Sequence, residues 1–366
     1  MIVVVGAGMA GLQTVVALRA QGYAGPLTLV GAEPEAPYDR PPLSKQVLAG
    51  ETDSSTLDAD WPGLDVDLRL GTAATEIGDG VLATDDGDIA FDRAVLTTGA
   101  LPRRLPGAER ALTLRTRADS LRLRAALRPG RRLTIVGAGW IGAEVATAAV
   151  ARGVEVTVVE GLPEPLASAL PLDVGARMRS WWSSVDLRLG EQVDAVEDGA
   201  VHLVGGGRVA ADVVLLGIGA SPVALPGVDR SPSGAVAVDA QLRTSRTGVF
   251  AAGDCAAWES ARYASTMHVE HWDNALHAPA VAAANVLGGS QVWDPVPYFW
   301  SEQWGRMVQY AGHHPVADRT VWREDGERWA VFWLAGERLV AALAVDRPRD
   351  LVQARHLMQR DAAVDA

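Results

Sequence analysis

Residues 2–11 have the sequence IVVVGAGMAG, and this stretch decides the fold of the first part of the chain. The β-branched run at 2–5 is typical of a strand buried on both faces. The apolar spacing at 12–20 predicts a helix, and the run at 27–30 predicts a second strand. Glycines between strand and helix allow a tight turn, and the helix N-terminus offers N–H groups to a pyrophosphate. The segment is therefore predicted to bind a dinucleotide.

The same pattern returns at residues 133–142, which have the sequence LTIVGAGWIG. A helix is expected from the glycines to about residue 151, followed by a strand at 154–159. In both copies a glutamate follows the second strand: Glu33 lies 27 residues beyond the first glycine of its copy, and Glu160 lies 23 residues beyond that of the second. A carboxylate there can accept hydrogen bonds from an adenosine ribose. One such copy is a weak signal, but two complete copies predict two dinucleotide sites.

The composition is that of an ordinary globular protein, with 366 residues of which 48% are hydrophobic and 21% charged. This length favours two or three domains. The net charge of −12 makes nucleic acid a poor partner, so we expect none. The single cysteine, Cys255, excludes an intramolecular dithiol mechanism and favours a reducing compartment, so we expect a cytoplasmic protein. We expect no membrane span, because no stretch has the roughly 18 to 20 consecutive apolar residues required, and no metal site, because the histidines lack ligand spacing.

Shorter strand patterns lie between and after the two glycine turns, at 66–70, 81–84, 94–96, 187–189, 201–204 and 213–216. These strands would extend or cover the two sheets. From Pro295 the sequence becomes rich in tryptophan and then has strand-like runs at 307–310, 320–323, 329–334 and 339–345, with a helix near 351–359. We expect this region to form a third, smaller α+β domain.

Two dinucleotide sites in a chain without a reactive cysteine pair predict a flavoprotein that accepts hydride from a nicotinamide. The expected cofactors are FAD and NAD. Glu160 suits a free ribose 2′-hydroxyl and would repel a 2′-phosphate. Residues 161–169 contain no arginine or lysine that could neutralise such a phosphate. The sequence therefore favours NADH over NADPH.

Three further motifs stand outside the glycine turns: PYDRPPLSK at 37–45, VEHWDNA at 269–275 and YFWSEQ at 298–303. Together with LTTG at 96–99 and VFAAGD at 249–254, their order and spacing closely resemble the oxygenase-coupled ferredoxin reductase family, which includes putidaredoxin and rhodocoxin reductases. The resemblance covers essentially the whole chain.

This resemblance implies a glutathione-reductase-like α/β fold, with two Rossmann-like dinucleotide-binding domains and a C-terminal α+β interface domain. The FAD-binding domain would be split over residues 1–107 and 240–294, with the NAD-binding domain inserted at 108–239 and the interface domain at 295–366. Members of the family pass electrons from NADH through FAD to a small [2Fe–2S] ferredoxin that serves a cytochrome P450 or a Rieske-type oxygenase. The expected partner is therefore a small acidic ferredoxin, and we expect the chain to be a monomer or weak dimer.

On the FAD side, the resemblance places the adenosine and pyrophosphate at the first glycine turn and its partners, namely Gly6, Gly8, Met9, Ala10, Gly11 and Glu33. Around the rest of the cofactor it places Arg40, Lys45, Ala74, Arg115, Gly253, Asp254 and Trp272. Asp254 would bind the ribityl chain, and Trp272 would present its backbone to the isoalloxazine. Lys45 is the only lysine in the chain, which favours a role for its compact ammonium near the flavin.

On the NAD side, the corresponding residues are Gly137, Gly139, Ile141, Gly142, Glu144, Glu160 and Gly219. Glu144 matches the family's glutamate that hydrogen-bonds the nicotinamide carboxamide and approaches the flavin-side lysine. Lys45 and Glu144 are therefore the predicted catalytic pair, which would hold the nicotinamide against the flavin without proton chemistry of its own. The alternative for Glu144 is a first-turn carboxylate that only complements the helix dipole.

The stretch from Arg115 to Arg132 is a candidate docking face for an acidic partner. Against the single acid Asp119 it carries six further arginines, at Arg117, Arg122, Arg124, Arg128, Arg131 and Arg132. The alternative is an ordinary solvated helix face.

Two other functions remain open from the sequence. One is an NADH-dependent oxidase or reductase of a small acceptor such as a quinone. The other resembles apoptosis-inducing factor, a flavoprotein whose reduced, NAD-bound form acts as an interaction partner with little turnover. Peroxidase and disulfide chemistry are disfavoured, because Ser44 and not cysteine lies in the flavin-side motif.

Overall fold

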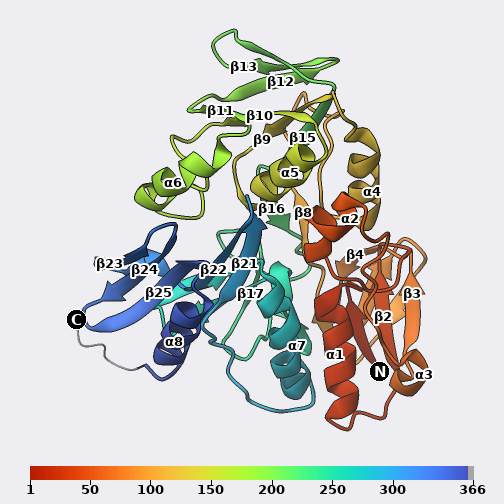
Figure 1. The fold of residues 1–366 in the computed structure, drawn as a ribbon. Helices are drawn as coiled ribbons and strands as arrows, with labels where there is room; N and C mark the ends of the chain where they lie inside the picture. Colours follow the sequence, from red (N-terminus) through yellow and green to blue (C-terminus); the bar gives the residue numbers. More distant parts are fainter. Residues whose placement is uncertain (362–366) are drawn as a thin grey trace.

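The run Ile2–Val5 forms β1, the central strand of a five-stranded parallel sheet with the order β18-β7-β1-β2-β3. Figure 1 labels two strands of this sheet, β2 and β3, close to the N-terminus. Its neighbours are β2 (Leu27–Gly31) and β7 (Arg93–Leu96), and the outer strands are β3 (Asp67–Leu70) and β18 (Val249–Ala251). Every residue of β1 and β2 is buried, which confirms the strand buried on both faces that the sequence predicts. The computed structural model describes residues 1–361.

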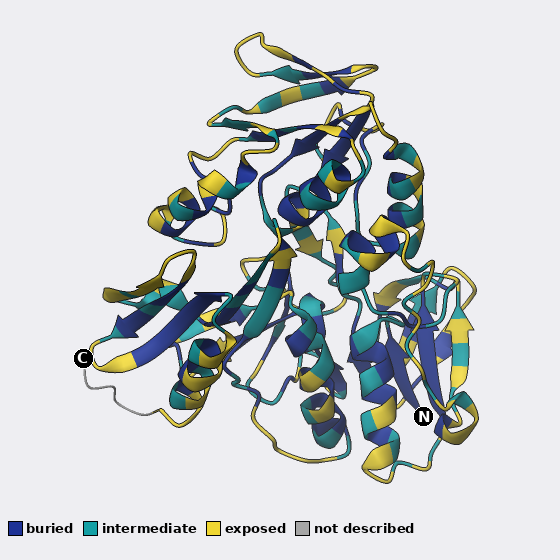
Figure 2. Ribbon diagram, in the orientation of Figure 1, coloured by how far each residue is buried: buried dark blue, intermediate teal, exposed yellow. Residues whose placement is uncertain are grey.

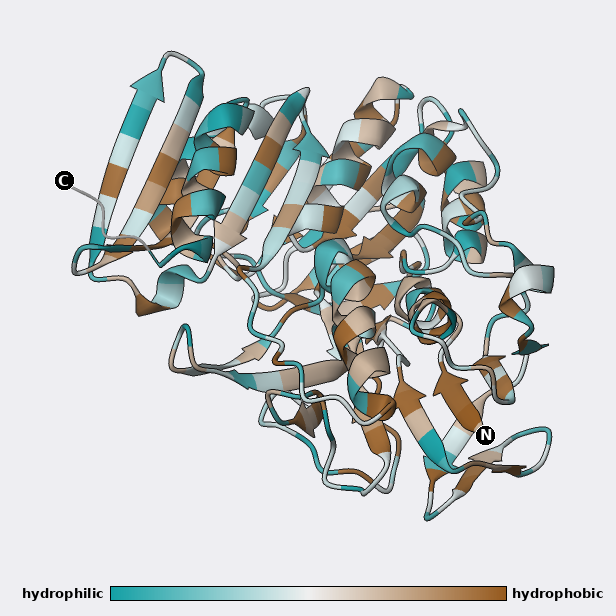
Figure 3. Ribbon diagram, turned by 90° about the horizontal axis from the view of Figure 1, so that it is seen from below, coloured by the Kyte–Doolittle hydropathy of each residue, from teal (hydrophilic) through white to brown (hydrophobic). Residues whose placement is uncertain are grey.

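Two helices, α1 (Met9–Ala20) and α7 (Trp272–Val286), pack against each other and against this first sheet. The strands that they cover are dark blue, for buried, in Figure 2, and the strands nearest the N-terminus are strongly apolar in Figure 3. Smaller elements surround the sheet: α2 (Gln46–Ala49), α3 (Trp61–Leu64), β4 (Ala74–Ile77), β5 (Val81–Thr84), β6 (Ile89–Ala90), β17 (Val236–Val238), β19 (Ala256–Ser260) and β20 (Ser265–His268).

The second glycine turn belongs to a separate four-stranded parallel sheet with the order β11-β10-β9-β15. Its strands are β9 (Arg132–Val136), β10 (Glu155–Glu160), β11 (Asp186–Leu189) and β15 (Val213–Leu216), and α5 (Trp140–Ala151) follows the turn. The same region contains α4 (Arg117–Ala126), α6 (Leu172–Met178) and a three-stranded antiparallel sheet of β12 (Val193–Glu197), β13 (Ala200–Leu203) and β14 (Arg208–Ala210). The two Rossmann-like units expected from the sequence are therefore both present.

The C-terminal region forms a five-stranded antiparallel sheet with the order β21-β22-β25-β24-β23, covered by α8 (Pro348–Gln359). The strands are β21 (Tyr298–Gln303), β22 (Arg306–Gly312), β23 (Arg319–Asp325), β24 (Arg328–Ala335) and β25 (Arg338–Val345). This confirms the expected third α+β unit. The sequence pattern did not identify its first strand, β21, which carries the YFWSEQ motif.

The third unit contacts both of the others. Arg177 on α6 lies over the rings of Trp322 on β23 and Trp329 on β24, with its guanidinium carbon 5.4 and 5.3 Å from the ring centroids. On the other side, Arg355 of α8 pairs with Asp273 of α7 at 3.1 Å. Figure 1 shows α6 beside β23 and β24. Strand β21 itself contacts α5 of the second unit and α7 of the first, so it lies between the two dinucleotide units.

The chain passes between the first two units at a short antiparallel pair, β8 (Ala100–Pro102) with β16 (Ala220–Pro222). The sequence predicts that residues 108–239 belong to the second unit, but β17 pairs with β19 and its valines lie in the core around the first sheet. We therefore propose that the chain passes from the first unit into the second near residue 102 and returns to the first unit near residue 222. The C-terminal domain was assigned to 295–366, and residues 362–366 lie outside the described part of the chain.

Within residues 1–361, none of the helices combines the length and the apolar character that crossing a membrane requires.

Candidate functional site

The first glycine turn is shaped for a ligand at the N-terminus of α1. A Cβ on Gly6, which has φ +113°, would lie 2.2 Å from the carbonyl oxygen of Thr97, and one on Gly11 would lie 1.9 Å from that of Gly6. A Cβ on Gly8 would meet nothing within 4 Å. Gly6 and Gly11 are thus required for close packing of the turn, while Gly8 faces open space in front of the helix. Such a cradle of unpaired N–H groups fits a pyrophosphate.

The second turn repeats this geometry at the start of α5. A Cβ on Gly137 would lie 2.5 Å from the carbonyl oxygen of Gly217, and one on Gly142 would lie 2.2 Å from that of Gly137. The nearest atom to a Cβ on Gly139 would be 3.8 Å away. In both glycine turns, the first and third glycines are therefore closely packed, and the middle glycine has open space in front of it.

Around the first turn, Glu33 is held by residues from the PYDRPPLSK motif. Arg40 donates to Oε1 of Glu33 at 2.7 Å, and the Tyr38 hydroxyl donates to Oε2. Burial raises the pKa of Tyr38 to about 12, so the hydroxyl keeps its proton and remains a donor. Arg40 also donates to the carbonyl of Arg115 at 2.6 Å. Glu33 and Arg40, both predicted cofactor residues, are therefore brought into one network.

Arg115 and Asp254 form a second network near the first turn. Nη2 of Arg115 donates to Oδ2 of Asp254 at 2.7 Å, and Nε of Arg115 is buried without a partner among the described residues. Gly253, with φ +80°, sits against α1, because a Cβ there would lie 3.0 Å from the Cβ of Ala10. An unpaired buried guanidinium N–H and a carboxylate beside the glycine cradle fit the polar groups of FAD.

Trp272 is the first residue of α7, and the side chain of His271, which precedes it, makes no capping hydrogen bond to this helix in the described part of the chain. The indole N–H of Trp272 donates to Oδ1 of Asp39 at 2.6 Å, and the ring of Trp300 lies edge-on to it with centroids 5.6 Å apart. Ala74 lies two residues after Thr72, whose N–H donates to Gly31 at the end of β2 at 2.9 Å. This places Ala74 at the carboxyl edge of the first sheet, where Glu33 also lies.

In the second unit, Glu160 is turned toward its own glycine turn. Oε2 accepts from the N–H of Ala138 at 2.7 Å, and Oε1 accepts from the N–H of Leu162 at 2.9 Å. Each oxygen keeps acceptor capacity for a ribose hydroxyl. Gly219 has φ +96°, a conformation that favours glycine, and Ile141 is 39% exposed at the start of α5.

The two units meet at Lys45 and Glu144. Nζ of Lys45 donates to Oε2 of Glu144 at 2.8 Å, and both side chains are largely buried. Two serines complete the set of donors: Ser44 donates to Oε2 and Ser301 donates to Oε1 at 2.7 Å. The structure thus brings the predicted catalytic pair together. The contact of Ser301 with Glu144 is not predicted by the sequence, in which the only signal for Ser301 is its place in the YFWSEQ motif.

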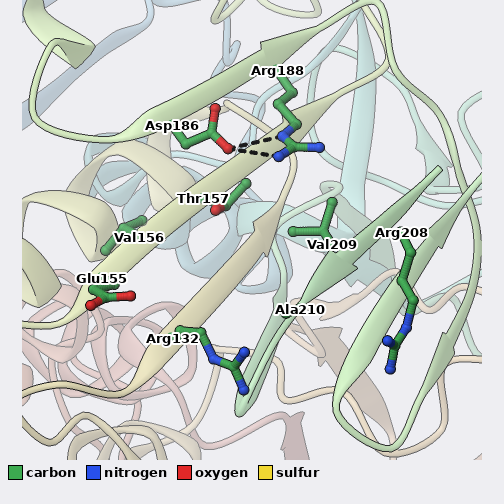
Figure 4. Close-up of a pocket in the computed structure, with 9 residues that line it drawn as sticks. All are labelled: Arg132, Glu155, Val156, Thr157, Asp186, Arg188, Arg208, Val209 and Ala210. Atoms are coloured by element: carbon green, nitrogen blue, oxygen red, sulfur yellow. Dashed lines mark hydrogen bonds and ion pairs between the residues drawn. The ribbon is translucent and has the colours of Figure 1, made fainter.

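A cavity of about 340 Å³ lies elsewhere, where strands of the second sheet begin (Figure 4). Its wall includes Arg132 and Asp186, the first residues of β9 and β11, together with Arg188 and Arg208. The glycine turn stands at the opposite, carboxyl edge of that sheet, so this cavity is not part of the candidate site.

The predicted arginine face is partly neutralised by the chain itself. Arg124 pairs with Asp53 at 2.6 Å, and Arg132 pairs with Asp212 at 2.6 Å. The hydrogen bonds from Arg132 lower the pKa of Asp212 to about 2, so this carboxylate stays charged. Arg122 is exposed on α4. The docking role of this face stays a prediction.

Comparison with known families gives two matches. Residues 1–278 match the pyridine nucleotide-disulphide oxidoreductase family, and residues 298–366 match the reductase C-terminal family.

Comparison with individual proteins identifies similar reductases. The chain is 35% identical to the ferredoxin–NAD(+) reductase component of the p-cumate 2,3-dioxygenase system of Pseudomonas putida, over 100% of this chain and 94% of that protein. Among solved structures, Fdr9 has a TM-score of 0.95 at 46% identity, covering 100% of this chain and 96% of the other. The putidaredoxin reductase in its covalent complex with putidaredoxin has a TM-score of 0.94 at 30% identity, covering 100% and 94%.

Proposed function

The chain belongs to the pyridine nucleotide-disulphide oxidoreductase family, and on that premise we propose that it is an FAD-dependent reductase that oxidises NADH and reduces a small [2Fe–2S] ferredoxin. The ferredoxin would supply a cytochrome P450 or a Rieske-type oxygenase. The observation that carries the proposal is the buried contact of Lys45 with Glu144, where the two glycine-turn units meet. Ser44 stands beside this pair in place of a thiol, which disfavours disulfide chemistry.

The residues of the first unit would hold FAD. Its pyrophosphate would lie at the first glycine turn, with Glu33 at the adenosine ribose and Arg115 and Asp254 along the ribityl chain. FAD, when bound, takes two electrons as a hydride and passes them on one at a time. The task of Lys45 and Glu144 is to orient the nicotinamide, since positioning of two reactants alone lowers the barrier substantially.

The second unit would bind NAD with a preference for NADH. Glu160 already accepts two backbone N–H groups and keeps acceptor capacity for the ribose 2′-hydroxyl. A 2′-phosphate would instead meet the negative charge of this carboxylate. The absence of arginine and lysine from residues 161–169 leaves that repulsion uncompensated in this segment.

A ferredoxin acceptor is supported by the names of the relatives. The protein of Pseudomonas putida is named as a ferredoxin–NAD(+) reductase component of a dioxygenase system, and the putidaredoxin reductase structure holds its reductase bound to putidaredoxin. The chain covers more than nine-tenths of both proteins, so the likeness includes all three units.

The deciding experiment is anaerobic reduction of the purified yellow protein by NADH or NADPH, followed by mixing with a panel of small [2Fe–2S] ferredoxins and cytochrome c. We expect rapid bleaching of the flavin by NADH and ferredoxin-dependent cytochrome c reduction. Fast bleaching with quinone turnover and no gain from ferredoxin would favour a small-acceptor reductase. A long-lived charge-transfer band with little turnover would favour the likeness to apoptosis-inducing factor, and a protein that holds no flavin would refute the proposal.

A further inference from the structure

The carboxylate of Glu144 is reached from two other parts of the chain. Lys45 and Ser44 both donate to Oε2, whereas Ser301 of β21 is the one side chain in the described residues that donates to Oε1. A carboxylate can accept about four hydrogen bonds. Three are formed here, so the remaining acceptor position is on Oε1, the oxygen that Ser301 holds.

Ser301 is itself rigidly placed. It is 1% exposed and lies in the β21–β22 ladder opposite Val308. Its hydroxyl oxygen accepts from Nε2 of Gln303 at 3.4 Å, so its proton is directed to Glu144. Since Gln303 is also 1% exposed, water cannot readily replace either partner.

A second hydrogen bond joins the same strand to the same helix. The N–H of Trp304, directly after β21, donates at 3.0 Å to Oγ1 of Thr147, which lies three residues after Glu144 on α5. This bond helps to fix β21 along α5 but does not involve the carboxylate. Thr147 therefore offers a matched control for the contact made by Ser301.

We propose that Ser301 is a positioning residue that orients Glu144 for the nicotinamide end of the bound nucleotide. The proposal rests on the function proposed above. With Ser301 in place, Glu144 is held at both oxygens, Oε2 stays on Lys45, and the free acceptor position of Oε1 is available to an amide N–H such as that of the carboxamide. Without the hydroxyl, the carboxylate is held at one oxygen only and can rotate.

The test compares Ser301→Ala with Thr147→Val in the FAD-loaded protein. Each removes one hydrogen bond between α5 and the segment of β21 and Trp304, and Thr147→Val also removes the bond from Oγ1 of Thr147 to the carbonyl of Ala143 within α5. Binding of NAD+ to the oxidised protein is measured by calorimetry, and kcat and KM for NADH are measured separately. Because hydrogen bonds to charged groups are the stronger class, we expect Ser301→Ala to weaken NAD+ binding about tenfold. We expect Thr147→Val to change it less than about twofold, because the carboxylate keeps all of its donors.

A double-mutant cycle with Glu144→Gln distinguishes positioning from a general loosening of the interface. If Ser301 acts through Glu144, Ser301→Ala has no further effect on NAD+ binding in the Glu144→Gln protein. Equal losses from Ser301→Ala and Thr147→Val, or the same loss from Ser301→Ala in both backgrounds, would overturn the proposal. If the alanine variant loses its flavin, Ser301→Thr and Ser301→Val make the same comparison, since they differ only in the hydroxyl.

This test does not use ferredoxin. A wild-type protein that is reduced by NADH but reduces no ferredoxin would refute the proposed acceptor and leave the comparison at Ser301 valid. If the loss of NAD+ binding caused by Ser301→Ala simply adds to the loss caused by Glu144→Gln, the role of Ser301 is refuted and the reductase function is left intact.

Discussion

Replacing Lys45 by methionine should destabilise the folded protein, because it leaves the charge of Glu144 buried without its ammonium partner. The Lys45 side chain is 14% exposed and that of Glu144 is 6% exposed, so solvent cannot take over this role. Ser44 and Ser301 would still donate to the carboxylate, but as neutral groups. Loss of one partner from such a buried pair is costly in proteins generally.

The size of the effect follows from the geometry. At the observed N···O distance of 2.8 Å, an effective dielectric constant of about 20 gives a gross attraction of roughly 6 kcal/mol. Because the two serines remain, we expect a net loss near the lower end of the usual range for buried pairs, about 3 kcal/mol. With an unfolding entropy of about 2.1 cal/mol/K per residue, a chain of 366 residues that unfolds as one unit would lose about 4 °C in Tm.

The assay is thermal unfolding of the FAD-loaded protein at neutral pH, for Lys45→Met, Glu144→Gln and the double variant. The double variant removes both charges, so it should recover at least half of the loss in Tm. Arg69→Met is the control, because its pair with Asp67 is 45% and 54% exposed and should contribute less than about 1 kcal/mol. A double variant that melts as low as Lys45→Met would falsify the argument from the unpaired charge.

Three further predictions concern the candidate site. Arg115→Ala should lower the flavin retained on purification, because it leaves Asp254 without its cation; an unchanged ratio of flavin to protein absorbance would contradict this. Glu160→Ala should lessen the discrimination against NADPH, and an unchanged ratio of kcat/KM for NADH and NADPH would remove the argument from its charge. Burial lowers the pKa of His271 from 6.5 to about 4, so the unfolded chain binds this proton more readily and stability should fall as the pH drops from about 6.5 to 4. His271→Gln should flatten this fall by about 3 kcal/mol, seen as a shallower dependence of Tm on pH.

The parts of the fold that repeat a local pattern were predictable from the sequence. The runs at 2–5 and 133–136 are β-branched or aliphatic without interruption, and both are buried central strands. Gly6 and Gly137 follow them, and each is in a conformation that only glycine adopts without strain. In these segments local propensity and tertiary packing agree, so a short stretch of sequence is sufficient.

Other parts were not predictable because their stability comes from distant contacts. Helix α7 contains Pro279, which removes one backbone hydrogen bond and weakens any local helix signal, yet packing against α1 maintains the helix. Strand β17 falls inside the range predicted for the second unit, but it pairs in parallel with β19 across the intervening strand β18, and the sequence pattern does not specify such a non-local pairing. The contact of Ser301 with Glu144 joins residues 157 positions apart, and no local pattern encodes it.

The charges at the junction of the three units also argue for a ligand. A buried ion pair contributes little to stability compared with apolar side chains of similar volume, which would hold the units together at least as well. The chain nevertheless places its only lysine there, opposite a glutamate that is supplied with two further hydroxyl donors. The present arrangement keeps a fixed carboxylate oxygen with one free acceptor position, which apolar side chains could not provide. We therefore infer that the junction is selected for binding rather than for holding the three units together.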